Sequence, residues 1–90
     1  MIREPINLKP ILPMKRQTAA EIATLASRYD CTFVFESRNV ILNAKSMLGL
    51  LSMTIPEDGE VTITADGTDE AAAVSAMCDL LRRMMAQEQK

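Results

Sequence analysis

The residues with chemically useful side chains lie in two short stretches of the chain. Lys15-Arg16 stands just before a predicted helix, and Ser46 stands just before an apolar run. A lysine acts as a nucleophile only when a desolvated site removes its proton. Two cations beside a helix N-terminus could instead bind an anion, but a solvated pair of basic side chains is the simpler interpretation of Lys15 and Arg16.

Ser46 is predicted to be the N-cap of a short helix, with its hydroxyl accepting a backbone N–H of the first turn. The helix must be short because Gly49 weakens it and Pro56 follows soon after. A serine at a helix N-terminus beside an exposed apolar patch also suits a phosphorylation switch, because the helix dipole stabilises the added charge. The alternative is an ordinary cap with no regulatory role, which this stretch by itself favours.

The run that follows this serine has more apolar side chains than one helix face can bury. On a helical wheel Leu50 falls with Met53, whereas Met47, Leu48 and Leu51 point largely elsewhere. A small core cannot accept both faces of so short a helix. We therefore expect one apolar face to stay at the surface as a contact site.

Other reaction chemistries lack the residues that they need. The chain has no histidine, which removes the commonest acid/base and the commonest metal ligand. Its three glycines are isolated, so there is no Gly-rich phosphate loop. Cys31 and Cys78 lie far apart without metal-ligand spacing; we interpret them as reduced, buried thiols and favour a disulfide less. We therefore expect no enzyme, no cofactor and no metal site.

Size and composition indicate a single domain over residues 1–90, with no repeat and no linker. A net charge of −2 gives no electrostatic reason to expect a nucleic acid or an anionic membrane as partner. No apolar run approaches the roughly 18 residues needed to span a bilayer, and the N-terminus lacks a signal-peptide pattern. We therefore expect a cytoplasmic protein.

Alternating apolar residues predict four strands, at residues 2–9, 31–36, 40–42 and 61–65. The second and third form a hairpin around the turn Ser37-Arg38-Asn39. Pro5 lacks a hydrogen-bond donor, which places the first strand at an edge of the sheet. The turn at residues 56–59 precedes the last strand.

A proline-stiffened loop follows the first strand. Pro10 and Pro13 enclose Ile11 and Leu12, and Met14 comes directly after. These apolar side chains are either tucked beneath the loop or offered to a partner, and the sequence leaves both possibilities open.

Helical spacing of apolar residues predicts two longer helices. The first covers Thr18–Tyr29, with an inward stripe of Ala19, Ile22, Ala23, Ala26 and Tyr29. The second begins after Asp69, its predicted N-cap; Glu70 and the pair Arg82-Arg83 complement the helix dipole. Its predicted buried stripe is Ala73, Val74, Met77, Leu80, Leu81 and Met84, and the tail from Gln87 is expected to fray.

The predicted order is β-α-β-β-α-β-α. The hairpin excludes an all-parallel sheet, so an antiparallel arrangement is the economical solution. We expect an α+β fold, an open-faced β-sandwich in which a four-stranded antiparallel sheet is covered on one face by three helices.

Three segments together resemble the HPr family, the small phosphocarriers of the bacterial sugar phosphotransferase system. The central segment is Asn43-Ala-Lys-Ser-Met-Leu-Gly-Leu-Leu-Ser-Met53, with Ser27-Arg-Tyr-Asp30 before it and Ile63-Thr-Ala-Asp-Gly-Thr-Asp-Glu70 after it. The resemblance covers nearly the whole chain and is most specific in the central segment.

The chain departs from the family pattern in the loop that carries the phosphoryl group. Where the family reads Gly-Leu-His-Ala-Arg-Pro-Ala-Ala, this chain reads Pro13-Met-Lys-Arg-Gln-Thr-Ala-Ala20. Lys15 thus takes the place of the phosphorylated histidine, and Gln17 that of the arginine that pairs with the phosphate. A protonated lysine cannot accept a phosphoryl group as a neutral imidazole does. The resemblance implies a homologue without carrier activity.

The resemblance also implies a regulatory role for Ser46. In HPr proteins of low-GC Gram-positive bacteria the matching serine is phosphorylated by HPr kinase/phosphorylase, and the product is corepressor of a LacI-type carbon-catabolite regulator. The paralogue Crh lacks the histidine and keeps the serine. By carry-over, the residues that meet the partner are Met47, Leu48 and Leu51 with Ala20 and Thr24, beside Lys15 and Gln17. The change to Gln17 weakens the expected affinity for the usual regulator or points to a different one.

Overall fold

The computed structural model describes residues 1–12, 14–38, 40–52 and 58–88. The predicted order of elements is confirmed over this part of the chain. The elements are β1 (Ile2–Asn7), the 3₁₀ helix η1 (Lys9–Ile11), α1 (Arg16–Ala26), β2 (Thr32–Ser37), β3 (Val40–Asn43), α2 (Met47–Ser52), β4 (Glu60–Asp66) and α3 (Glu70–Glu88).

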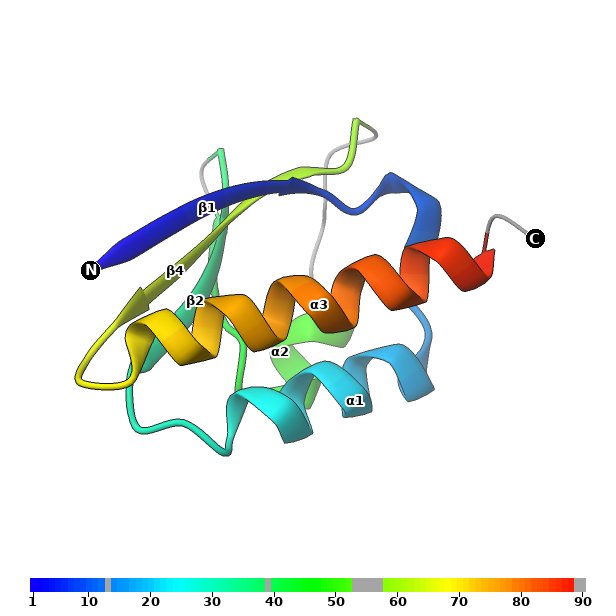
Figure 1. The fold of residues 1–90 in the computed structure, drawn as a ribbon. Helices are drawn as coiled ribbons and strands as arrows, with labels where there is room; N and C mark the ends of the chain where they lie inside the picture. Colours follow the sequence, from blue (N-terminus) through cyan, green and yellow to red (C-terminus); the bar gives the residue numbers. More distant parts are fainter. Residues whose placement is uncertain (13, 39, 53–57, 89–90) are drawn as a thin grey trace.

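The four strands form one antiparallel sheet in the order β1-β4-β2-β3. The three α-helices lie together against one face, with α1 and α3 side by side (Figure 1). The other face is open, so the predicted α+β open-faced sandwich is confirmed. The core between sheet and helices consists mainly of aliphatic side chains packed around two phenylalanine rings. Its largest fully buried side chains are Phe33, Phe35, Leu8, Ile22, Leu50, Ile63, Met77 and Leu81.

The place of Pro5 at a sheet edge is confirmed by the hydrogen-bond pattern. Leu8 N–H donates to Gly59 O at 2.8 Å, which continues the β1–β4 ladder. Because backbone groups alternate in direction along a strand, the even-numbered residues of β1 bond to β4. Pro5 therefore faces outward, where its missing N–H leaves no bond unmade.

The first strand is shorter than predicted, and the loop after it is partly helical. β1 ends at Asn7, whose side-chain oxygen accepts the N–H of Lys9 at 2.9 Å and starts η1. Ile11 is buried, and Leu12 and Met14 pack half-buried against the core. The open question about this loop is thus decided: its apolar side chains are tucked beneath it.

Helix α1 begins two residues earlier and ends three residues earlier than predicted. Its C-terminal end tightens where Ser27 N–H and Oγ–H both donate to Ala23 O, at 3.0 and 2.7 Å. Tyr29 therefore lies beyond the helix and is half-buried. The rest of the predicted inward stripe is confirmed as buried, namely Ala19, Ile22, Ala23 and Ala26.

Asp69 does precede α3, and its carbonyl accepts the N–H of Ala73 at 2.9 Å. Its carboxylate, however, accepts N–H groups of Asp30 and Cys31, at 2.8 and 3.1 Å, instead of capping its own helix. The prediction of Asp69 as the N-cap residue is thus confirmed by its position, while its carboxylate binds the loop before β2. Glu70 instead reaches back to Gly67 N–H at 3.3 Å, as in one half of a capping box.

The C-terminal part of α3 corrects two further expectations. The helix continues through Glu88, so Gln87 is helical and not part of a frayed tail; residues 89–90 lie outside the described part. Leu80, in contrast, is only half-buried, because its side chain lines a hollow at the surface between its own helix and α1. The other members of the predicted stripe are buried.

The cysteines are free and buried, as predicted. Burial raises the pKa of the Cys31 thiol, and the neighbouring carboxylate of Asp69 raises it further. Burial also raises the pKa of the Cys78 thiol. Both thiols are therefore protonated near neutral pH, which removes their nucleophilic form.

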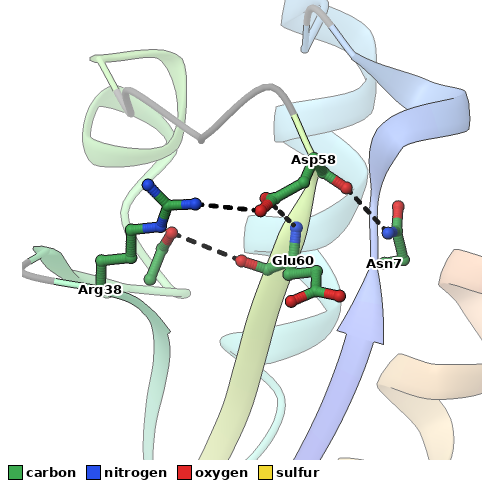
Figure 2. A network of polar contacts seen from close by, with 5 residues as sticks. Asn7, Arg38, Asp58 and Glu60 are labelled. Carbon is green, nitrogen blue, oxygen red and sulfur yellow. Dashed lines mark hydrogen bonds and ion pairs between the residues drawn. The ribbon is translucent and has the colours of Figure 1, made fainter.

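One end of the sheet is joined by a polar network (Figure 2). Asp58 accepts from the Arg38 guanidinium at 3.0 Å and from the N–H of Glu60 at 3.1 Å, and its carbonyl accepts from Asn7 Nδ2 at 2.8 Å. These bonds connect the end of β1, the turn between β2 and β3 and the start of β4. Arg38 occupies the left-handed region, with φ 45°, so the pair stabilises a turn conformation that an arginine rarely adopts.

Candidate partner-binding site

Ser46 caps α2 as predicted. Its Oγ accepts the N–H of Gly49 at 3.1 Å, and its carbonyl accepts the N–H of Leu50 at 3.0 Å. Ser46 N–H in turn donates to Asn43 O at 3.0 Å, which closes the turn after β3. The serine is half-buried, so its hydroxyl is held in one position at the beginning of the helix.

The three predicted surface residues of α2 differ in exposure. Leu50 is fully buried, as the helical wheel predicts, while Leu48 is 76% exposed and Leu51 39% exposed. Met47 is half-buried and packs against the core, so it contributes less to the surface than expected. Met53, the expected companion of Leu50, and the turn residues 56–57 lie outside the described residues.

A hollow between α1 and α2 brings part of the predicted site together. It is lined by Ala20, Ala23, Thr24, Ser27 and Met47. Small side chains on α1 leave this space open, and the side chain of Met47 closes its α2 side. Ala20 and Thr24 are thus placed beside α2, as the family resemblance implies.

Lys15 and Gln17 lie at the N-terminal end of α1, and Gln17 also lines a hollow with Ala20 and Thr24 between α1 and α3. Lys15 occupies the N-cap position with extended backbone (φ −88°, ψ 159°), makes no side-chain capping bond, and accepts the N–H of Ala19 through its carbonyl at 2.9 Å. Both residues line a hollow on the α3 side, together with Thr18, Glu21 and the end of α3. Met47 lines the hollow on the α2 side of α1, whereas Lys15 and Gln17 line the one on the α3 side. The candidate site is therefore a curved surface around α1.

Lys45, the residue before the serine, is held in place by two hydrogen bonds. Lys45 Nζ donates to the carbonyl of Tyr29 at 2.7 Å, and Lys45 N–H donates to Asn43 Oδ1 at 2.9 Å. The first turn of α2 contains no acidic residue. A negative charge added at Ser46 thus meets a cation one residue away and no like charge in that turn.

Sequence reasoning missed Ala23 and Ser27 as members of the α1 surface. A signal was available, because residues 20, 23, 24 and 27 follow the spacing of one helix face. In the sequence-based prediction, Ala23 belongs to the core alone and Ser27, within the predicted helix Thr18–Tyr29, has no place in the partner-binding surface. The structure shows that one residue can serve both the core and the edge of a hollow.

The described residues contain neither a metal-ligand cluster nor a helix that could cross a membrane. No three His, Cys, Asp or Glu side chains gather as metal ligands among them. Nor does any helix of this part combine the length and the apolar character that crossing a bilayer requires.

Solved structures with similar folds include three informative ones. HPr-C-His from Thermoanaerobacter tengcongensis is 28% identical with a TM-score of 0.84; the match covers 96% of this chain and 97% of that one. An HPr dimer from the same organism is 30% identical with a TM-score of 0.70, over 81% and 83% of the chains. Crh from Bacillus subtilis, described as an intertwined dimer with a swapped domain, is 28% identical with a TM-score of 0.70, over 78% and 80%.

The sequence also matches a family model. The model describes the phosphorylation site of the HPr component of the phosphotransferase system, and residues 8–83 match it. This range includes the helices α1 and α2, the strands β2, β3 and β4, and α3 as far as residue 83. With the predicted fold confirmed and the family model spanning most of its length, this chain belongs to the HPr family.

Proposed function

We propose that this family member is a regulatory adaptor without phosphohistidine carrier activity, switched by phosphorylation of Ser46. One observation carries the proposal: the chain is a member of the HPr family, yet its sequence contains no histidine. By resemblance, Lys15 replaces the histidine and Gln17 the phosphate-binding arginine. What remains is a capping serine next to exposed Leu48 and Leu51.

The proposed partners follow from the same resemblance. HPr kinase/phosphorylase would modify Ser46, and a LacI-type regulator would bind the phosphorylated surface in carbon-catabolite regulation, in the cytoplasm. The apolar side chains of Leu48 and Leu51 would supply contact area, and the α1–α2 hollow with Ala20 and Thr24 would receive a side chain of the partner.

Intact-mass measurement after incubation with HPr kinase and ATP tests the proposal. We expect one added phosphate on the wild type, none on Ser46→Ala, and one on the control Ser27→Ala, which removes a different hydroxyl, one that lines the α1–α2 hollow. A histidine-containing HPr serves as the positive control for the kinase. If that control is labelled and this protein is not, the switch is excluded.

A constitutive interaction module is the second candidate. It is favoured by the bond between Ser46 Oγ and Gly49 N–H, which gives the hydroxyl a complete structural role. In this case Ser46→Asp leaves the affinity for a partner unchanged, whereas the switch requires a change. Acid-labile phosphate after incubation with enzyme I and phosphoenolpyruvate would support neither candidate and would point to a carrier that uses another residue.

A further inference from the structure

The two free edges of the sheet differ in their protection against pairing with another strand. An edge strand presents unpaired backbone groups, which proteins usually shield with proline or charge. β1 carries both, since Pro5 faces outward and the charged residues Arg3 and Glu4 precede it in the strand. β3, with the sequence Val40-Ile-Leu-Asn43, has neither a proline nor a charged residue.

The backbone of Ile41 points away from the sheet. Ala44 N–H donates to Phe33 O at 2.9 Å, and the β2–β3 register continues this pattern to the pair Phe35 and Leu42. Because antiparallel pairs alternate, Ile41 belongs to a pair that does not exchange hydrogen bonds with β2. In the described part of the sheet, its N–H and C=O therefore lack a ladder partner.

The side chains of β3 are apolar on both faces of this edge. Ile41 is 69% exposed on the open face of the sheet. Val40 and Leu42 point to the opposite face and are half-buried. A strand added here would cover apolar surface on both faces as well as satisfy the backbone.

The ionisable residues next to Ile41 are already paired within the chain. Glu36, its cross-strand neighbour, accepts from Arg3 at 3.0 Å and from Thr64 Oγ1 at 3.2 Å. Arg38, at the turn that leads into β3, is held by Asp58 (Figure 2). An approaching strand would thus meet no uncompensated charge at these two positions.

We propose that β3 pairs antiparallel with β3 of a second copy of this chain, around a two-fold axis between the two Ile41 residues. In this register the two Ile41 residues exchange both backbone hydrogen bonds, and their side chains lie together on the open face. On the other face, Val40 of each copy lies opposite Leu42 of the other. The two four-stranded sheets then form one continuous sheet.

The strand itself identifies a second copy as the occupant. Reversing Val40-Ile-Leu places an apolar residue opposite an apolar residue at every position, so the edge is complementary to itself. Four residues of strand bury far less than the roughly 1,600 Å² of a typical stable interface. The dimer is therefore weak, and its population rises with protein concentration.

Sedimentation equilibrium over a wide concentration range tests this pairing. We expect the average mass of the wild type to rise above 9.9 kDa with concentration and that of Ile41→Lys to stay at the monomer value. Ile41→Pro removes the outward donor while keeping the bonds to β2, as Pro5 does in β1, and should also remain monomeric. Leu48→Lys is the matched control, because Leu48 is similarly exposed on α2, and should dimerise like the wild type.

Amide exchange gives a second readout, since the Ile41 N–H should become protected as concentration rises. Circular dichroism shows that each variant remains folded. A wild type that stays monomeric throughout would overturn the proposal. So would a dimer that survives both Ile41 substitutions, as an exchange of whole strands between copies would, or a dimer that only Leu48→Lys abolishes.

Discussion

The Oγ atom of Ser46 lies 3.1 Å from the backbone nitrogen of Gly49, which donates a hydrogen bond to it. A Cβ atom at position 49 would lie 3.3 Å from the same oxygen. Glycine therefore leaves the serine hydroxyl less crowded than any other residue would, although it weakens the helix itself. The helix begins with a satisfied backbone donor next to the proposed site of modification.

Ser46→Ala should lower the free energy of unfolding by about 1 kcal/mol, because the Gly49 N–H loses its acceptor. Ser46→Asn should retain most of the stability, since its side chain can still cap the helix, while neither variant can be phosphorylated. Urea unfolding of both variants and the wild type measures the difference. Equal stability of Ser46→Ala and the wild type would mean that the observed bond contributes nothing in solution.

Leu50 should contribute mainly to stability and Leu48 mainly to partner binding, although the two residues lie only two positions apart in α2. Leu50→Ala creates a cavity in the core and should cost about 2–5 kcal/mol of stability. Leu48→Ala, at a position 76% exposed, should change stability by no more than about 0.5 kcal/mol.

Binding should show the reverse pattern. Leu48→Ala should weaken the regulator complex, measured by calorimetry at a temperature where both variants are folded. A Leu48 variant that binds as well as the wild type would move the contact surface away from this side of α2.

The Asp69 carboxylate should make stability depend on pH in the acid range. Hydrogen bonds from the N–H groups of Asp30 and then Cys31 lower its pKa in the folded protein. The unfolded chain therefore binds a proton more readily than the folded one, and stability is lost as pH falls below the ordinary aspartate pKa of about 3.9.

Urea unfolding between neutral and acidic pH measures this loss. Asp69→Asn should be less stable at neutral pH and lose less stability on acidification than the wild type. Asp79→Asn, which removes an exposed carboxylate on α3, controls for the change in net charge. If the stability of Asp69→Asn falls as steeply with acid as that of the wild type, other carboxyl groups account for the slope.

Arg38→Gly should stabilise the protein slightly. A non-glycine residue in the left-handed region costs about 1–2 kcal/mol, whereas the ion pair with Asp58, on a side chain 72% exposed, is worth at most about 1 kcal/mol. Thermal unfolding should therefore show a higher Tm for Arg38→Gly and a lower Tm for Arg38→Ala, which loses the pair and keeps the strain. A decrease for both variants would assign the larger contribution to the ion pair.

The two thiols should react slowly with a thiol reagent in the native state. Both are buried, and burial raises the pKa of each, so the reactive thiolate is scarce and shielded. In denaturant both should react at once. Rapid reaction of Cys31 without denaturant would show that the segment between α1 and β2 opens readily. Asp69→Asn, which leaves one acceptor oxygen in place of two for this segment, should increase the rate.

Local patterns in the sequence determine much of this fold. Alternation around Phe33 and Phe35 predicts β2, and the missing donor of Pro5 predicts an edge strand. The cap at Ser46 depends on a contact three residues along the chain, which is within reach of sequence reasoning. The correspondence between Lys15 and the phosphorylated histidine of the family rests on resemblance, and the loss of carrier activity remains a prediction.

Only the tertiary structure decided the features that depend on distant segments. Asp69 could cap its own helix, yet its carboxylate binds backbone groups of Asp30 and Cys31, which the fold brings beside it. The apolar sequence of β3 predicts burial as readily as exposure. In the part of the chain that the structure describes, the helices cover the other face of the sheet and β3 is its last strand, which leaves Ile41 exposed. The sequence determines which side chains are apolar, whereas the packing of the helices and strands determines which of these side chains are buried.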